Sequence, residues 1–177
     1  ANQRIRDAGV NGAIDSLRTD GKQIFGSGWA YGDGASFEGT FGADPLTGKI
    51  NFVNDCHGDT YDIFPMGTVL YAASHAHDCE WIGGFANSPY TPLQHSFGTA
   101  FTTYPTGVNT GPDDYSPFWS EFNYSGQPSS TLLDWFPSLI PGTYTGQGQA
   151  AWSLTGNSKY VSYGGEFVNV GGTNQQG

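Results

Sequence analysis

A strand motif that occurs three times in the sequence is the feature that most limits how this chain can fold. Its copies span residues 22–31, 68–77 and 159–167. Each copy follows a short turn, and each turn follows another apolar segment, so each copy predicts a β-hairpin. Phe25 and Tyr71 are 46 residues apart, and Tyr71 and Val161 are 90 apart. These spacings fit one step and then two steps of a repeat of roughly 40 to 50 residues.

Composition and periodicity both favour strands over helices. Aromatic residues make up 15% of the 177 residues, and 27 residues are glycine. Aromatic side chains suit the half-buried surface of a sheet, whereas glycine is typical of the turns between strands. No window keeps apolar residues three and four apart for more than about two helical turns. We therefore expect an all-β protein that forms a single domain, because a chain of this length buries one ordinary core.

The first repeat is complete enough for its strands to be counted. After the hairpin that starts at Ile14, a second hairpin is expected around the Asp44–Gly48 turn, in which glycine can take a positive φ. Four antiparallel strands over residues 14–53 match one blade of a β-propeller. A second blade is expected over residues 59–107. It contains an insertion of roughly fourteen residues near 85–94, where the sequence is typical of a surface loop.

The rest of the chain is harder to divide into blades. Residues 108–148 combine many prolines and aromatic residues, and they predict either a degenerate blade or an irregular loop with one outer strand at 131–135. Residues 150–177 predict the start of the next blade. The fold expected is therefore a partial or open β-propeller with two to four antiparallel blades, which needs further blades or other copies of the chain to cover its edges. The start at Ala1 without methionine suits a mature or excised product, and the last repeat stops before any strand that could complete it, so we also expect a fragment of something longer.

Gly-Gly pairs and one turn suggest a relationship to known repeats. The pairs are at 83–84, 164–165 and 171–172, and the turn is Asp44–Gly48. Together with the hairpins they resemble the kelch-like and quinoprotein-like β-propeller repeats of large secreted bacterial proteins. The resemblance implies a propeller fold, but it carries over no catalytic residue, since propellers have many unrelated activities. The chain lacks the Trp-Asp pair that closes blades in some propellers and the Tyr and Trp spacing of true kelch repeats.

The distribution of charge excludes some partners. The formal net charge is −10, and no Lys or Arg occurs between Lys49 and Lys159. Such a surface repels phosphate backbones, so nucleic acid is not expected as a partner. No apolar run reaches the length of a membrane span. We expect a protein that is secreted or displayed at the cell surface.

Two cysteines lie in the densest group of candidate ligands. A disulfide between Cys56 and Cys79 is the favoured interpretation, because an even cysteine count suits an exported protein. A closed loop of this size would stabilise the fold by roughly 3 kcal/mol. The alternative is a zinc site, since alternating side chains on a strand share a face and Cys79 follows two histidines at that spacing. Its candidate ligands outside the cysteines are His57, His75, His77 and Asp78.

Two other ligand sites are weaker. Asp55, Asp59 and Asp62 are close in sequence, but the alternating acidic loop of a typical calcium site is absent. An aromatic and acidic stretch could bind glycans, because rings stack on sugars and carboxylates accept hydrogen bonds from hydroxyl groups. Its residues are Asp113, Asp114, Tyr115, Trp119, Glu121 and Trp135. Packing of a loop onto the sheet would explain the same rings.

Strong repeats without a catalytic motif point away from an enzyme. The sequence has no Gly-x-Ser-x-Gly elbow, no His-Glu-x-x-His helix and no phosphate-binding loop. The function expected is an extracellular structural or interaction module that acts as a scaffold, adhesion surface or assembly unit. Its partners would be other copies or further blades of the same chain. A carbohydrate-binding or glycoside-cleaving domain and a metal-binding module are the alternatives.

Overall fold

The computed structural model, which describes residues 11–31, 37–87, 95–111 and 124–175, consists of antiparallel β-sheets joined by turns and loops. The one helical element within these ranges is a 3-10 turn, η1 (Glu80–Ile82). The all-β prediction is confirmed. Among the described residues, no helix is long and apolar enough to cross a membrane.

The N-terminal sheet contains four strands that pair in sequence order. They are β1 (Asn11–Thr19), β2 (Ile24–Tyr31), β3 (Phe37–Ala43) and β4 (Ile50–Asp55). The turn between β3 and β4 forms because the Asp44 carboxylate accepts the backbone N–H groups of Leu46 and Thr47, at 3.0 and 2.7 Å. Gly48 completes this turn with a φ of 68°, which glycine adopts without strain. Four strands are what the sequence predicts for residues 14–53.

The second sheet has three strands and an outer edge supplied by a later segment. Its strands are β5 (Thr60–Met66), β6 (Val69–Ala76) and β7 (Ser96–Thr102). The Thr102 N–H donates to the Thr131 carbonyl at 3.0 Å, and the Leu133 N–H donates to the Ala100 carbonyl at 2.8 Å. Residues 131–133 therefore lie along β7, within the stretch 131–135 that predicts an outer strand. Part of the expected insertion, residues 88–94, lies outside the described residues.

The third hairpin forms a two-stranded sheet from β11 (Ala151–Gly156) and β12 (Val161–Gly165). Short strands complete the fold, namely β8 (Gly107–Val108), β9 (Pro128–Ser129), β10 (Leu139–Ile140), β13 (Asn169–Val170) and β14 (Thr173–Asn174). β8 pairs with β9, and β13 pairs with both β10 and β14. Residues 108–148 thus contain β9, β10 and the end of β8, and no four-stranded blade in their described part.

Each hairpin contains a bulge at the same place. Asp15 in β1, Tyr61 in β5 and Trp152 in β11 are each an extra residue where the register with the second strand shifts. Such bulges increase the local twist and bend the strand. The first two extra residues are 46 residues apart, and the second and third are 91 apart. The sequence alignment of the second and third copies gave a spacing of 90, so the structure places the third copy one residue later in the chain.

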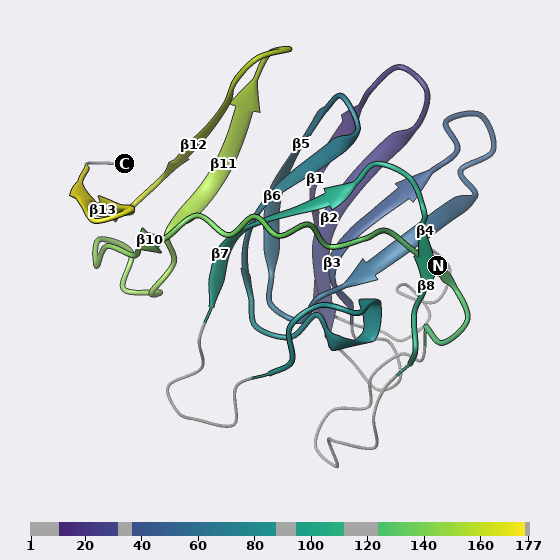
Figure 1. Ribbon diagram of the computed structural model, residues 1–177, viewed down its shortest axis with the longest axis horizontal. Helices are drawn as coiled ribbons and strands as arrows, with labels where there is room; N and C mark the ends of the chain where they lie inside the picture. Colours follow the sequence, from purple (N-terminus) through teal and green to yellow (C-terminus); the bar gives the residue numbers. More distant parts are fainter. Residues whose placement is uncertain (1–10, 32–36, 88–94, 112–123, 176–177) are drawn as a thin grey trace.

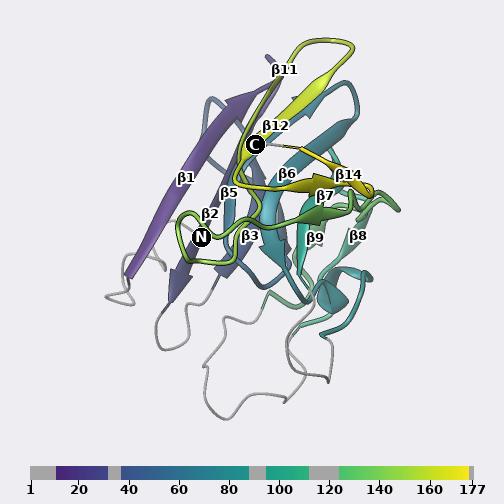
Figure 2. The same ribbon diagram turned by 90° about the vertical axis from the view of Figure 1, so that its left-hand side faces the viewer.

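The first strands of the three hairpins lie side by side. β5 has β1 on one side and β11 on the other, and the later strands of each sheet extend away from this line (Figures 1 and 2). The described residues close neither a barrel nor a propeller. Three repeated units are therefore placed next to one another through their first strands.

Two buried clusters fill the spaces between these units. The cluster between the first two sheets is built around Phe25, Phe52, Ile63, Leu70 and Phe101. The cluster between the second sheet and the third hairpin is built around Ala73, Phe97, Leu139, Ala151, Leu154 and Phe167. Burial of this apolar surface is the main force that holds the units together.

Candidate functional site

A disulfide joins the two segments that carry most of the predicted ligands. Cys56 and Cys79 are bonded, buried, and have Cα atoms 4.1 Å apart, so the predicted disulfide is confirmed. A bonded cysteine cannot be a thiolate ligand, which removes both sulfur atoms from the zinc alternative. Next to the disulfide, the His77 N–H donates to the His57 carbonyl at 2.8 Å.

All four histidines of the chain gather beside this disulfide. His57 precedes β5, His75 lies on β6, His77 follows β6, and His95 precedes β7. The ring centroids are 6.1 Å apart for His57 and His77, 5.9 Å for His77 and His95, and 5.4 Å for His75 and His95. The four imidazoles come from the start of β5, the end of β6 and the start of β7. They form one contiguous group, which we call the histidine cluster.

His75 is held by hydrogen bonds at both ring nitrogens. The Asp59 N–H donates to Nε2 at 3.2 Å, and the Tyr61 hydroxyl lies 3.0 Å from Nδ1. The side-chain amide of Gln149 is also within hydrogen-bond distance of Nδ1. Burial and the nearby Asp59 carboxylate raise the pKa of Tyr61, so its hydroxyl keeps its proton. His75 aligns with Trp29 of the first copy of the strand motif, and both of its ring nitrogens have polar partners.

His77 is the central ring of the cluster. Its Nδ1 atom is buried and has no hydrogen-bond partner among the described residues. Burial, followed by the nearby His57, His95 and His75, lowers the pKa of His77 to about 4. Burial and His75 also lower the pKa of His95, whose side chain remains exposed. Both imidazoles are therefore neutral at neutral pH.

His57 lies between an aromatic ring and a carboxylate. Its ring stands edge-on to the buried ring of Trp81, with centroids 4.6 Å apart. Its Nε2 atom is 3.9 Å from Oδ2 of Asp55, which is almost fully buried. These neighbours fix the orientation of the His57 ring.

The structure brings together three of the four non-cysteine residues proposed as zinc ligands. His57, His75 and His77 belong to the cluster, whereas Asp78 accepts the Glu80 N–H at 3.0 Å, two residues before η1. His95 is the member that the sequence did not predict, because it lies 18 residues after His77, beyond the insertion. Across the described ranges, no three His, Cys, Asp or Glu side chains are already positioned to hold a metal ion.

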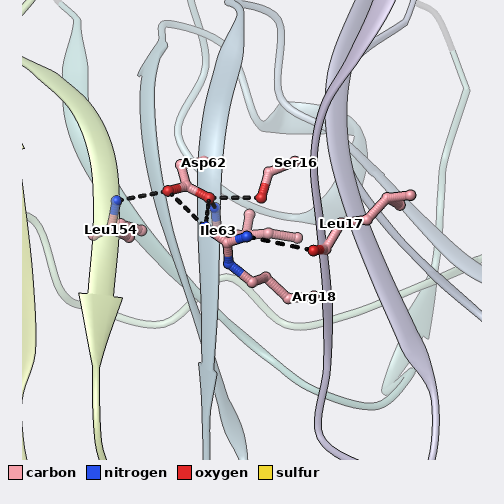
Figure 3. Close-up of polar contacts among 6 residues, drawn as sticks. All are labelled: Ser16, Leu17, Arg18, Asp62, Ile63 and Leu154. Atoms are coloured by element: carbon pink, nitrogen blue, oxygen red, sulfur yellow. Dashed lines mark hydrogen bonds and ion pairs between the residues drawn. The ribbon is translucent and has the colours of Figure 1, made fainter.

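Asp62, one of the calcium candidates, serves instead as a junction between the repeats (Figure 3). It is 7% exposed, and its Oδ1 accepts the Ser16 hydroxyl at 2.6 Å and the Arg18 guanidinium at 2.8 Å. Its Oδ2 accepts the Leu154 N–H at 2.8 Å. The carboxylate on β5 therefore binds donors from β1 and β11, and these donors occupy the lone pairs that calcium would need.

Most of the proposed glycan-binding residues cannot be placed. Asp113, Asp114, Tyr115, Trp119 and Glu121 lie outside the described residues. Trp135 is 37% exposed, and its ring packs against Tyr71 and Tyr163 with centroids 5.1 and 5.9 Å apart. In the described part of the stretch, an aromatic ring thus packs a loop onto the sheets.

Comparisons with known proteins do not assign the site. No family model, curated protein or solved structure matches this chain. Its function has to be inferred from the geometry of its own residues.

Proposed function

We propose that this chain is a non-enzymatic extracellular module of open β-propeller type, and that two copies associate through the outer edge of β12. The observation that carries the proposal is the unequal pairing of equivalent strands. β2 pairs with β1 and β3, and β6 pairs with β5 and β7, whereas β12 pairs with β11 alone within the described residues. β12 also lies at the outer margin of the molecule (Figure 1).

The hairpin register identifies which backbone groups face outward. The Asn157 N–H donates to the Tyr160 carbonyl, which closes the turn between β11 and β12. Antiparallel pairs alternate between bonded and non-bonded, so Ser162 bonds to β11 while the backbone groups of Val161 and Tyr163 point away from it. Leu154 lies opposite Tyr163, so the register predicts that its N–H also points away from β12. The N–H does so, because it donates to Asp62.

An edge of this kind is a template for another strand. Unpaired N–H and C=O groups in a row favour strand addition from a second molecule. An apolar ring is exposed at one end of β12, since Tyr160, the residue before the strand, is 70% exposed. The same edge on two molecules can pair antiparallel about a two-fold axis, which gives a closed dimer. The confirmed disulfide supports an extracellular location.

Replacing one outward N–H tests the dimer. Val161→Pro removes an N–H that faces the open edge, without removing a bond to β11. Val161→Ala shortens the same side chain but keeps the N–H, so it is the matched control. We expect dimers for the wild-type chain and Val161→Ala, and monomers for Val161→Pro, measured by light scattering over a range of concentrations.

Two results would contradict the dimer. One is a wild-type chain that stays monomeric at all concentrations. The other is equal association of the proline and alanine variants while circular dichroism shows that both are folded.

A further inference from the structure

The histidine cluster also has the chemistry of a transition-metal site. We infer that His57, His77 and His95 bind one divalent zinc ion through their imidazole nitrogens. This inference goes beyond the proposed dimer and does not depend on it. It replaces the ligand set that the sequence suggested, because the cysteines are bonded to each other and the Asp78 carboxylate already accepts the Glu80 N–H.

Two of the three proposed ligands are held together before any metal binds. The disulfide joins Cys56, the neighbour of His57, to Cys79, two residues after His77. The backbone bond from His77 to the His57 carbonyl fixes the same two segments. A site of this kind loses little conformational entropy on binding, because its segments are already ordered.

The spacing of the rings is close to that of a zinc site. In a tetrahedral site with Zn–N bonds of about 2.0 Å, two imidazole centroids lie about 5 Å apart. The centroids of His57 and His95 are 6.1 and 5.9 Å from that of His77. The rings of His57 and His95 must therefore each approach that of His77 by about 1 Å. The exposed side chain of His95 can rotate toward its neighbours, and it leaves a path for the ion from solvent.

His77 supplies a second observation that points to a ligand. Its Nδ1 is buried without a hydrogen-bond partner among the described residues. Buried nitrogens of this kind are rare in native proteins, and a bound metal ion is one of the partners that satisfies them. Metal-binding histidines are commonly oriented by a carboxylate near the ring nitrogen that does not bind the metal. Asp55 lies close to Nε2 of His57 and is in the position for this role.

The fourth histidine is a neighbour and not a ligand. Both nitrogens of His75 already have protein partners, as Asp59 donates to Nε2 while Tyr61 and Gln149 face Nδ1. Three imidazoles select zinc, copper or nickel over calcium and magnesium, which prefer oxygen ligands. Among these, zinc is the ion that best suits a tetrahedral site without redox chemistry.

Titration of the oxidised 177-residue chain with zinc chloride tests this site. The protein is first stripped with EDTA and dialysed, and heat is then measured at neutral pH. We expect saturable binding of one zinc ion per chain, and no binding of calcium or magnesium at the same concentrations. Cobalt at the same site should give the intense visible absorption of tetrahedral coordination.

Single variants separate ligands from neighbours. Replacing His57, His77 or His95 by alanine should weaken zinc binding at least about tenfold. His75→Asn should keep the wild-type affinity, and it is the matched control because it removes a histidine from the same cluster. His95→Ala is the decisive variant, since its exposed side chain can be removed without disturbing the core. Unchanged affinity in His95→Ala, or the absence of saturable zinc binding to the wild-type chain, would overturn the site.

Discussion

At the scale of single residues, Asp62 links all three repeats through its carboxylate. Its carboxylate binds Ser16 and Arg18 of β1 and the Leu154 N–H of β11, in addition to its own neighbour Ile63 (Figure 3). A buried carboxylate with this many donors is strongly stabilised only while all of its partners are present.

Asp62→Asn should therefore destabilise the protein. The amide has nearly the same shape, but it loses the charge that pairs with Arg18 and places a donor against other donors. We expect a loss of about 2–4 kcal/mol in the free energy of unfolding, measured by urea denaturation. Asp134→Asn, on an exposed side chain, is the control and should change the value by less than about 0.5 kcal/mol. Equal stability of both variants would contradict the role of Asp62.

His77 predicts how stability depends on pH in the metal-free protein. Its pKa is about 4 in the folded state and is lowered from 6.5, so the unfolded chain binds more protons between these values. Stability should therefore fall as the pH drops from about 6.5 to about 4, and this contribution should level off below that range. Thermal unfolding in EDTA at a series of pH values measures it. The change of stability with pH between about 4 and 6.5 should be smaller in His77→Gln than in the wild-type chain. An unchanged pH dependence would assign the effect to other titratable groups.

At the scale of elements, a glycine lies opposite the bulge in the first and third hairpins, whereas Ser74 takes this place in the second. Gly28 pairs with Ile14 and Gly165 pairs with Ala151, in each case with the residue before the extra one. A Cβ atom at Gly28 would come within 2.1 Å of the Ala13 carbonyl oxygen. The backbone of the bulged strand approaches so closely that a side chain does not fit.

Gly28→Ala should consequently destabilise the first hairpin. The clash is with a backbone atom, which can move only if the strand moves, and overpacking of this kind costs about 1–3 kcal/mol. Gly107→Ala is the control, because the nearest atom to its added Cβ is 3.7 Å away. Denaturant unfolding compares the two variants. A Gly28→Ala protein as stable as Gly107→Ala would show that β1 can shift to relieve the contact.

Hairpin elements were readable from the sequence because their signals are local. Alternating apolar residues and the turn around Gly48 specify strands and turns within a few residues of chain. The position of residues 131–133 on β7 was expected only as one of two alternatives. It depends on contacts with Ala100 and Thr102, which are some thirty residues away. The short strands between 107 and 170 have too few residues for a periodic signal.

At the scale of the whole molecule, charge opposes the proposed dimer. Each chain carries a formal net charge of −10, with only six Lys and Arg residues. Two such molecules repel each other at long range, whereas strand pairing and apolar contact act only at close range. Salt should therefore weaken the charge repulsion between the molecules far more than the strand pairing and apolar contact.

Association should therefore become stronger as salt is added. We expect the dimer fraction of the wild-type chain to rise between about 20 and 300 mM sodium chloride, measured by sedimentation or light scattering. Val161→Pro should remain monomeric at both concentrations. A dimer that dissociates on addition of salt would indicate attraction between charged patches and not pairing of β12.

The sequence by itself determined the all-β class and the three hairpins, because strands and turns depend on short-range patterns. It favoured the disulfide between Cys56 and Cys79 but left a zinc site as the alternative, and the structure decided between them. Only the tertiary structure decided that Asp62 joins three sheets, that His95 enters the histidine cluster, and that β12 pairs with β11 alone in the part of the chain that the structure describes. These features come from residues that are distant in the chain, and the packing of the repeats against one another is what brings them together.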